Sequence, residues 1–216
     1  MPLSEGKQAL MRAFREATYV LSTHDPEQLP HDSIAEVAFV GRSNSGKSSA
    51  INALTCRRRL AHVSRTPGRT QSINFFNVGR GRYLVDLPGY GYAAVGAAQR
   101  RQWDRLISTY IKSRRPLRGL VLVMDARHPF GPLDRQLLRW IEPDRTACHI
   151  LLTKSDKLAA RVRMTAYEDA RAAIDEIAPQ CTVQLFSGRT AEGADHARAI
   201  VAKWLEGNKK PPVKGE

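Results

Sequence analysis

Short apolar runs alternate with longer amphipathic segments along most of the chain. The apolar runs predict strands at residues 36–40, 73–78, 83–86, 120–125, 149–153 and 182–186. The amphipathic segments predict helices at residues 47–60, 97–113, 132–141, 159–177 and 194–206. Strands that alternate with helices at this spacing indicate an α/β fold, in which a mostly parallel sheet is covered by helices on both faces.

Two segments depart from this alternation. Residues 73–78 and 83–86 are joined only by the short "GRGR", which predicts an antiparallel hairpin. Residues 4–22 space their apolar side chains as a helix does, with Ser4 as a possible N-cap. The predicted organisation is a helical N-terminal extension and link over 1–33, one domain over 34–206 and a basic tail over 207–216.

The charge balance indicates a polyanionic partner. The 216 residues include 34 lysines and arginines against 21 aspartates and glutamates, which gives a formal net charge of +13. Lysine and arginine neutralise phosphates with release of counterions, so this excess favours RNA, although each cluster alone could be a solvated surface. The clustered basic residues are Arg57, Arg58, Arg59, Arg100, Arg101, Arg105, Arg114, Arg115, Arg118, Lys209, Lys210 and Lys214.

Other features exclude several classes of protein. The three cysteines form no C-x-x-C pair and the six histidines show no metal-ligand spacing, so we expect neither a disulfide framework nor a zinc site. The longest apolar run, residues 120–124, is too short to cross a bilayer, and the N-terminus mixes charges among its apolar residues. We therefore expect a soluble cytoplasmic protein, and a monomer because nothing indicates a dimer surface.

The polar motif after the first strand of the alternating pattern predicts a phosphate-binding loop. Its sequence "GRSNSGKS" matches G-x-x-x-x-G-K-[ST], in which backbone N–H groups cradle phosphates. Lys47 would supply charge to the β- and γ-phosphates, and Ser48 a hydroxyl to Mg²⁺. A Gly/Ser turn beside a helix cap is the alternative, but the flanking strand and helix disfavour it. The predicted loop residues are Gly41, Arg42, Ser43, Asn44, Ser45, Gly46, Lys47 and Ser48.

A second motif, "DLPG", ends the strand at 83–86. Asp86 could hold Mg²⁺ through water, and the N–H of Gly89 could meet a γ-phosphate, although such turns are common. The next residue, Tyr90, occupies the position where a glutamine would orient the attacking water. Tyr90 and Tyr92 could stack on bases or pack against the helix behind, and packing is favoured.

A third motif, "TKSD" at residues 153–156, favours guanine over adenine. The Asp156 carboxylate can accept hydrogen bonds from the N1–H and the 2-amino group of guanine, and adenine offers neither. If this motif is considered without the others, the alternative is that its charged residues only follow the end of a buried strand. Between the first two motifs, Thr66 and Thr70 compete to give a hydroxyl to Mg²⁺, in a loop made flexible by Gly68 that could order and disorder with hydrolysis.

Taken together, these motifs resemble a known family. The blocks "GRSNSGKSSAINAL", "PGRTQSINFF", "DLPGYGYA", "TKSDK" and "LFS" are similar to those of the bacterial EngB (YihA/YsxC) GTPases, of the TrmE–Era–EngA–EngB–septin superfamily. The resemblance covers roughly residues 15–205, and the first three blocks are specific to that family rather than to GTPases in general. It implies a Ras-like P-loop GTPase fold with a six-stranded sheet, binding of GTP and Mg²⁺, and a role in assembly of the large ribosomal subunit. It also links the chain to cell division and septation.

The resemblance extends the predicted site and assigns its metal ligands. Thr70 takes the Mg²⁺-binding position together with Ser48. The chain departs from the family after Phe186, where Ser-Ser or Ser-Ala is usual, so we expect weaker nucleotide affinity that Gly188→Ala would raise. The further nucleotide-binding residues are Gly68, Arg69, Thr70, Gln71, Ser72, Asp86, Leu87, Pro88, Gly89, Thr153, Lys154, Ser155, Asp156, Phe186, Ser187 and Gly188.

Catalysis without a glutamine needs another source of assistance. Relatives with an asparagine at the position of Asn44 use K⁺ against the phosphates, so Asn44 is assigned a catalytic role with Lys47, unless it only shapes the turn. Arg69 could act as a finger but is better explained as an RNA contact. We expect slow intrinsic GTP hydrolysis, stimulated by K⁺ and the ribosome. An RNA-binding scaffold with rarely hydrolysed GTP is the alternative, and an ATP-dependent phosphotransferase ranks last.

Overall fold

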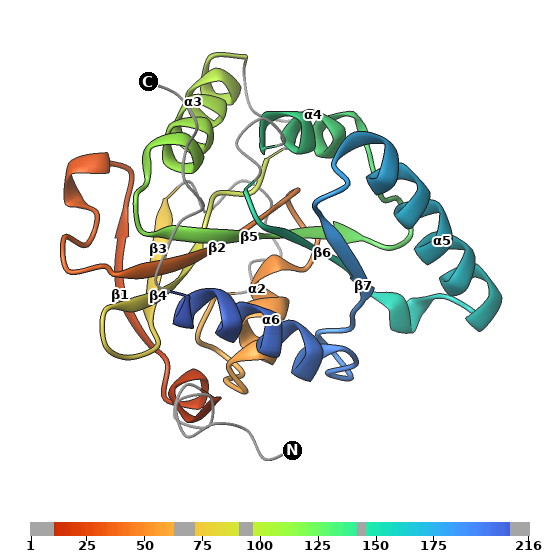
Figure 1. The fold of residues 1–216 in the computed structure, drawn as a ribbon, viewed down its shortest axis with the longest axis horizontal. Coiled ribbons are helices and arrows are strands. Elements are labelled where there is room, and N and C mark those ends of the chain that lie inside the picture. Colours follow the sequence, from red (N-terminus) through yellow and green to blue (C-terminus); the bar gives the residue numbers. More distant parts are fainter. Residues whose placement is uncertain (1–10, 63–71, 91–96, 142–145, 208–216) are drawn as a thin grey trace.

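The computed structural model describes residues 11–62, 72–90, 97–141 and 146–207. In these residues a single sheet lies between two layers of helices, as the α/β pattern predicts (Figure 1). The order in the sheet is β1-β3-β4-β2-β5-β6-β7. The strands, in chain order, are β1 (Thr18–Thr23), β2 (Ala35–Gly41), β3 (Ile73–Asn77), β4 (Arg82–Asp86), β5 (Leu117–Asp125), β6 (Cys148–Thr153) and β7 (Thr182–Leu185).

Five neighbouring strands run parallel, and the two at one edge do not. The strands β4, β2, β5, β6 and β7 pair in parallel, whereas β3 pairs antiparallel with both β4 and β1. The predicted hairpin is confirmed: β3 and β4 are joined by a turn in which Gly79, Arg80 and Gly81 have positive φ. Parallel strands bring their carboxyl ends to one edge of the sheet, which is where the polar motifs lie.

The helices cover the two faces of the sheet and form two separate cores. On one face α3 (Ala97–Ser113), α4 (Pro132–Ile141) and α5 (Ala160–Ile177) pack against the sheet (Figure 1). On the other face α2 (Lys47–Leu54) and α6 (Ala194–Glu206) pack together with Phe14. Two 3-10 turns, η1 (Pro26–Gln28) and η2 (Ser155–Lys157), complete the elements. Both faces of β2 and β5 are therefore buried, which explains their continuous apolar sequences.

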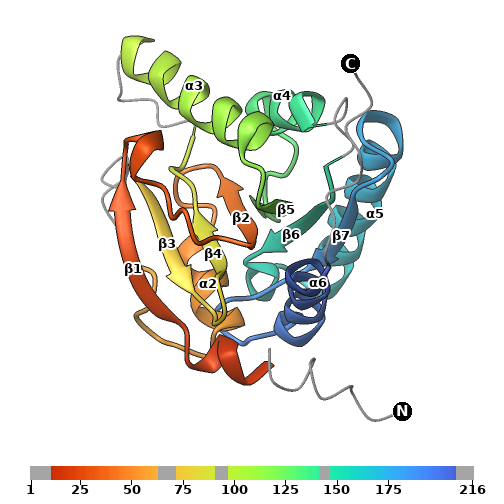
Figure 2. The same cartoon turned by 60° about the vertical axis from the view of Figure 1, so that its left-hand side comes forward.

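The helix predicted over residues 4–22 is wrong in its second half. Residues 11–15 are helical, but 18–23 form β1, which pairs with β3 at the edge of the sheet (Figure 2). The sequence "TYVLST" is rich in β-branched and aromatic residues, and pairing with β3 satisfies its backbone. The sheet consequently has seven strands rather than the six that the family resemblance implies. Residues 1–10 lie outside the described residues, and the predicted domain boundaries remain a prediction.

The helix predicted over 47–60 is also shorter than expected. It ends at Leu54, because the Thr55 hydroxyl donates back to the carbonyl of Ile51 at 2.8 Å and Cys56 takes a positive φ of 54°. The buried guanidinium of Arg198, on α6, donates to the carbonyl oxygens of Leu54 at 2.6 Å and Ala53 at 3.2 Å. Arg198, 144 residues from Leu54 in sequence, thus satisfies the Leu54 carbonyl and adds a second donor to the Ala53 carbonyl, which also accepts from the N–H of Cys56. The arginines that follow are exposed rather than helical.

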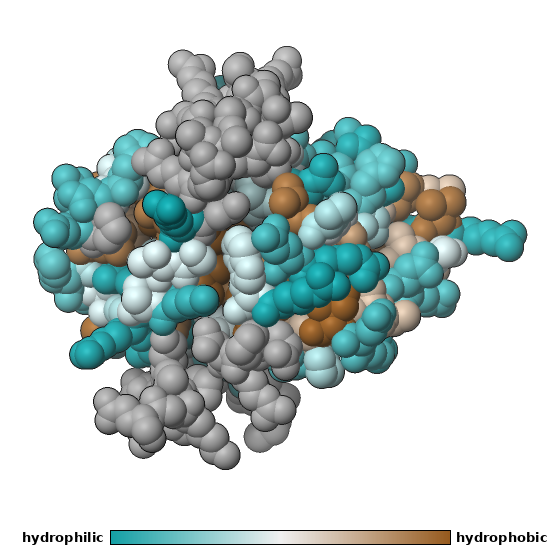
Figure 3. Space-filling model, turned by 90° about the horizontal axis from the view of Figure 1, so that it is seen from above, coloured by the Kyte–Doolittle hydropathy of each residue, from teal (hydrophilic) through white to brown (hydrophobic). Residues whose placement is uncertain are grey.

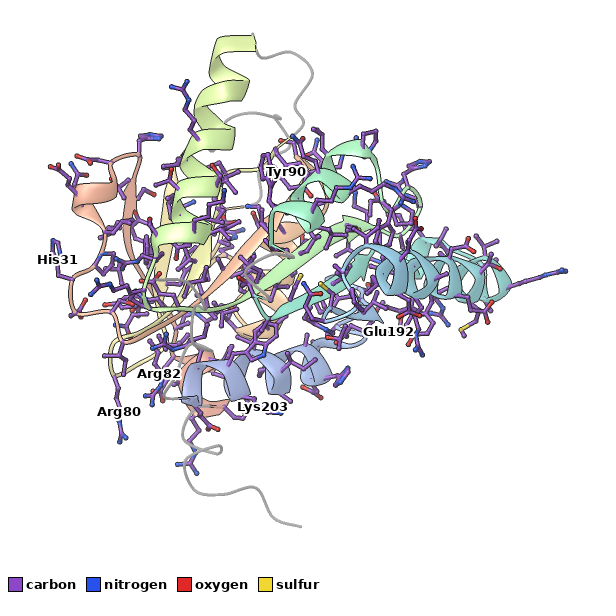
Figure 4. The ribbon with its side chains drawn as sticks, turned by 45° about the horizontal axis from the view of Figure 1, so that its top comes forward. His31, Arg80, Arg82, Tyr90, Glu192 and Lys203 are labelled. Atoms are coloured by element: carbon purple, nitrogen blue, oxygen red, sulfur yellow. The ribbon has the colours of Figure 1, made fainter. Side chains whose placement is uncertain are left out.

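The surface seen from above is mainly hydrophilic, with hydrophobic residues in scattered patches (Figure 3). Within the described ranges, none of the helices combines the length and the apolar character needed to cross a bilayer. The side chain of Arg82 joins the hairpin to the end of α6, because its Nε donates to the carbonyl of Leu205 at 2.9 Å (Figure 4). This contact links the start of β4 to the helix layer that contains α6.

Candidate nucleotide-binding site

The loop 41–48 turns sharply between β2 and α2. Gly41 lies beside Val123 of β5, and a Cβ atom on Gly41 would overlap the carbonyl oxygen of Val123. The loop then reverses through two left-handed residues, Asn44 with φ of 64° and Gly46 with φ of 97°, before α2 begins at Lys47. Backbone N–H groups at such a turn and at a helix N-terminus form a cradle for an anion.

Lys47 and Asp86 form an ion pair across this cradle. The ammonium of Lys47 contacts the Asp86 carboxylate, and the two residues are only 9% and 4% exposed. The pair joins the first residue of α2 to the last residue of β4. A buried lysine paired with a single carboxylate keeps donors free for phosphate oxygens, and the carboxylate keeps acceptors for the water of a hydrated cation.

One buried polar atom of the loop has no partner. The Oγ atom of Ser45 makes no hydrogen bond, although Ser45 is only 3% exposed. Such an orphaned hydroxyl is expected to be satisfied by water or by a ligand. Together with the cradle and Lys47, it makes the residues of this loop fit a bound phosphate group.

The "DLPG" turn is fastened directly to the phosphate loop. The N–H of Ser43 donates to the carbonyl of Tyr90 at 3.0 Å, and the N–H of Tyr90 donates to the carbonyl of Gly41 at 3.2 Å. These bonds extend the parallel pairing of β2 and β4 into the two loops, as an isolated bridge between Arg42 and Tyr90. A Cβ atom on Gly89 would come within 3.2 Å of the Ser43 nitrogen, so glycine permits the close approach.

The side chain of Tyr90 lies against α4 rather than over the phosphate loop (Figure 4). It is 7% exposed, and its hydroxyl donates to Asp134 at 2.5 Å. Burial, and then the nearby Asp134 carboxylate, raise the pKa of Tyr90 well above its usual value. Burial also raises the pKa of Asp134, against hydrogen bonds from Tyr90 and the Gly131 N–H. The expectation that Tyr90 packs rather than stacks is confirmed, whereas Tyr92 lies outside the described residues.

The "TKSD" motif contacts the phosphate loop from β6. The Thr153 hydroxyl donates to the carbonyls of Ser45 and Met124, the latter at 2.9 Å. Lys154, with φ of 59°, extends its ammonium to the carbonyl of Asn44 at 2.7 Å and to Asp125 at 2.8 Å. Lys154 therefore holds the loop in place.

The Asp156 carboxylate is presented at the same edge of the sheet. Ser187 donates to its Oδ1 at 2.6 Å, and Arg189 Nε contacts its Oδ2 at 2.9 Å. The hydrogen bond from Ser187, followed by that from Arg189, lowers the pKa of Asp156, which keeps it ionised and able to accept. Arg189 is largely exposed, so a guanine base could replace it on the carboxylate at little cost.

Gly188 lies against the start of α2. A Cβ atom on Gly188 would come within 2.9 Å of the Ser49 Cβ and 3.1 Å of the Ser49 carbonyl oxygen. The preceding Phe186 is fully buried, and its carbonyl accepts from the Ser155 hydroxyl at 2.8 Å. The glycine is therefore required by close packing, which argues against the expectation that Gly188→Ala would raise nucleotide affinity.

The remaining predicted residues fall into two groups. Leu87 is fully buried and donates its N–H to the carbonyl of Phe39 at 3.0 Å, so it anchors the turn before Pro88. Ser72 lies immediately before β3 and lines a hollow that also contains Asp86. The second group lies outside the described residues and comprises Gly68, Arg69, Thr70 and Gln71.

The sequence analysis missed three residues of the site: Asp125, Asp134 and Arg189. Asp125 ends β5, and hydrogen bonds from Arg127 and Lys154 hold its pKa well below its usual value even though burial opposes them. Asp125 stands at the end of a predicted strand, a signal that could have identified it, whereas nothing in the pattern indicated that Arg189 or Asp134 would reach these motifs.

A metal at this site would depend on the nucleotide. Across the described parts of the chain, no three His, Cys, Asp or Glu side chains come together in a way that could hold a metal ion. Ser48 is the second residue of α2, which agrees with a role beside the phosphate loop but does not test it. The assignments of Ser48 and Thr70 as Mg²⁺ ligands remain predictions.

Comparison with known proteins gives one consistent result. A family model described as 50S ribosome-binding GTPase matches residues 36–154. A probable GTP-binding protein EngB of Methylobacillus flagellatus is 47% identical over 195 residues, which cover 90% of this chain and 94% of the relative. One of Azoarcus sp. is 50% identical over 196 residues, with the same coverage of both chains.

Solved structures support the fold. The crystal structure of a probable GTP-binding protein engB aligns with a TM-score of 0.64 at 18% identity, covering 79% of this chain and 98% of the other. Era in complex with MgGDPNP and a segment of 16S ribosomal RNA aligns with a TM-score of 0.63 at 17% identity, covering 86% of this chain and 60% of the other. On the level of identity to the curated relatives, over nine-tenths of its length, the chain belongs to the EngB family of GTP-binding proteins.

Proposed function

We propose that the protein binds GTP and hydrolyses it to GDP as a switch in assembly of the large ribosomal subunit. The observation that supports this most directly is the convergence of three motifs, where Lys154 donates to the Asn44 carbonyl and Lys47 pairs with Asp86. The phosphate loop, the "DLPG" turn and the "TKSD" motif would therefore contact a single bound nucleotide. The ribosomal partner follows from the ribosome-binding family and from the net charge of +13.

The residues have distinct proposed roles. Backbone N–H groups of residues 41–48 bind the phosphates, and Lys47 neutralises charge on the β- and γ-phosphates. Asp156 reads guanine, with Ser187 holding its carboxylate in place. Mg²⁺, held by Ser48 and Thr70, would supply further charge neutralisation at the phosphates.

We assign the catalytic assistance that a glutamine gives in other hydrolases to a K⁺ ion held by Asn44. Tyr90 is turned away toward Asp134, so it leaves no side chain to orient water from that position. Asn44 is exposed, its backbone has a positive φ, and its carbonyl accepts a hydrogen bond from Lys154. This bond would hold the backbone of Asn44 in place, so that the side-chain amide oxygen stays beside the phosphate loop. The test compares GTP turnover in K⁺ and Na⁺ buffers for the wild type and Asn44→Ala. K⁺ stimulation that Asn44→Ala abolishes is the expected result, and equal turnover in both ions excludes the role.

A second experiment tests the switch itself. GTP turnover is measured with and without large ribosomal subunits, and subunit binding is compared in GDP and in a non-hydrolysable GTP analogue. Stimulated turnover with binding that depends on the analogue is expected for a switch. Binding that ignores the nucleotide, with no stimulation, would instead support the alternative of an RNA-binding scaffold whose GTP is structural.

The same proposal places the protein in the cytoplasm as a monomer. Effects on cell division and septation would then follow from defective subunit assembly. Depletion of the protein should cause accumulation of incomplete large subunits before any change in septum formation, and the reverse order in a time course would contradict this.

A further inference from the structure

An exposed tyrosine lies beside exposed arginines at the edge of the sheet. Tyr19, on the edge strand β1, is 54% exposed. It forms a hollow of 330 Å³ with Arg57 and Arg59, and the lining is completed by Thr18 and Leu60. Among the described residues no acidic side chain lines this hollow, so its two arginines meet no opposing charge from them.

The aromatic ring is held in place by the strand beneath it. Tyr19 pairs with Phe76 of β3, and the two rings meet edge to face with centroids 6.2 Å apart. Phe76 is only 2% exposed, so it provides a rigid support. A ring that is anchored along one side and open on the other has lost most of its conformational freedom already, and it could stack on a flat ligand at a low entropic cost.

The arginines beside Tyr19 are also placed where they could bind a ligand. Arg57, Arg58 and Arg59 are all exposed, and none forms an ion pair with a carboxylate in the described part of the chain. In that part of the chain the guanidinium of Arg57 makes only one hydrogen bond, a long one of 3.5 Å to the carbonyl of Arg15, while its backbone N–H donates to the carbonyl of Asn52. Their positions follow from the early end of α2 at Leu54, which directs them onto the surface beside β1.

The basic surface continues around the end of α2. Arg57 also lines a second, open hollow of 630 Å³ between α2 and α6, together with Arg15 and Arg58, and the one acidic residue among its described lining residues, Asp195, is paired with Arg198. Tyr19 and Leu60 line a third hollow, of 290 Å³, that extends to Ser72 and Asp86. A chain of phosphates could therefore follow the arginines from α6 to β1 and end next to the side of the nucleotide site where Asp86 lies.

We propose that Tyr19, Arg57 and Arg59 form a docking site for single-stranded RNA, with an unpaired base stacked on Tyr19 and its flanking phosphates on the two arginines. This inference rests on the proposed ribosomal function and adds a location and a mode of recognition. Stacking on an aromatic ring combined with a positively charged track is how proteins hold single strands with little dependence on sequence.

The experiment uses the full-length protein, isolated large ribosomal subunits, and a fluorescent single-stranded RNA of mixed sequence. Tyr19→Ala is expected to weaken RNA binding roughly 5- to 150-fold, whereas Tyr19→Phe, which keeps the stacking surface, retains it. The double variant Arg57→Gln/Arg59→Gln should reduce the slope of log affinity against log salt by about 1.4. Matched controls on α5 are Tyr167→Ala and the double variant Arg161→Gln/Arg171→Gln, which change the same groups at a distant helix.

The affinity for GDP and the thermal midpoint of each variant show whether it is folded. Undiminished binding of subunits and RNA by Tyr19→Ala and by the double variant at 57 and 59 would overturn the docking site and leave the proposed function intact. Subunit binding that depends on Tyr19 but is not competed by the RNA would indicate a protein partner and would also overturn it. If the wild type fails to bind subunits, the proposed function is wrong, and the docking site is then decided by the RNA alone: Tyr19-dependent binding supports it and no binding overturns it.

Discussion

The hydroxyl of Tyr90 donates to the carboxylate of Asp134 across 2.5 Å, and both residues are almost fully buried. Tyr90 immediately follows the turn that holds Asp86 and Gly89, so this hydrogen bond ties the nucleotide site to α4. It also turns the ring away from the position where a catalytic side chain would orient water. The turn therefore has a structural partner where hydrolases with a glutamine have a catalytic group.

Removal of the hydroxyl should destabilise the fold without affecting nucleotide recognition. In Tyr90→Phe the N–H of Gly131 is the one donor that the buried Asp134 keeps among the described residues, so we expect a loss of about 1–3 kcal/mol in the free energy of unfolding. Urea denaturation measures this loss. The affinity for GDP should change by no more than about twofold, or about 0.4 kcal/mol in binding free energy, because the Tyr90 side chain faces α4 and not the phosphate loop. The matched control is Tyr83→Phe, because its partner Asp32 is exposed and can be solvated. A loss in the control equal to that in Tyr90→Phe would show that burial of the acceptor is not the cause.

Placing a glutamine at position 90 should not raise the rate of GTP hydrolysis. The Tyr90 backbone is fixed by its bonds to Gly41 and Ser43, and its side chain enters the core beside α4. A glutamine placed there would lie in the same buried space, away from the phosphate loop. We expect Tyr90→Gln to lose stability and to show no rise in intrinsic GTP turnover, measured by phosphate release. A clear increase in turnover would mean that this side chain can reach the nucleotide.

The sequence predicted the parts of this molecule that depend on local pattern. Six strands and the helices predicted at 97–113, 132–141, 159–177 and 194–206 are confirmed, because the apolar spacing of their described side chains coincides with burial. The end of α2 was missed because the positive φ of Cys56 and the contact from Arg198 on a distant helix leave no mark on the apolar pattern. The strand β1 was missed because most of its residues are exposed, so it lacks the alternation of buried and exposed positions that predicts a strand. The motifs of the site were identified by their order, whereas the partners of Tyr90 and Asp156 depend on tertiary contacts that no local pattern contains.

Gly188→Ala is predicted to weaken nucleotide binding. The added methyl group would press on the backbone of Ser49, directly after the predicted metal ligand Ser48, and would move either the guanine loop or the start of α2. Overpacking of this kind costs about 1–3 kcal/mol, which corresponds to roughly 5- to 150-fold in affinity if it acts on the bound state alone. Titration with a fluorescent GDP measures the change. Gly207→Ala is the control, since a Cβ there meets no atom of the described residues closer than 3.6 Å, and unchanged or tighter binding by Gly188→Ala would contradict the prediction.

Asp156→Asn should exchange guanine for xanthine. The carboxylate accepts from two donors of guanine, whereas an asparagine amide can donate to the carbonyl that xanthine carries in place of the 2-amino group. We expect a fall of about 10²-fold or more in affinity for GDP, since a buried donor is left unpaired, and a gain for xanthosine diphosphate. Competition titrations of both nucleotides check this, with Asp175→Asn on α5 as the control. Retention of the guanine preference would show that Asp156 does not contact the base.

The buried His149 should make stability fall as the solution becomes acidic. Burial lowers its pKa from 6.5 to about 4, against the hydrogen bond that it donates to the side-chain oxygen of Gln184, and the ring of His196 faces it at 6.0 Å. Its two nitrogens lie 2.7 Å from the Thr182 hydroxyl and 2.9 Å from the Gln184 side-chain oxygen, which suits the neutral ring. The folded state therefore binds its proton less readily than the unfolded chain. Stability is complete above pH 6.5 and declines between 6.5 and 4, by at most about 3 kcal/mol.

The contribution of His149 can be separated from that of other groups by difference. His149→Gln removes the titrating ring but keeps a polar side chain, so the free energy of unfolding of the wild type minus that of the variant should decrease by up to about 3 kcal/mol between pH 7 and pH 4. His196→Gln is the control, because its ring faces His149 without being its hydrogen-bond partner and should change the slope less. Parallel curves for the wild type and His149→Gln over this interval would show that His149 does not resist protonation in the folded protein.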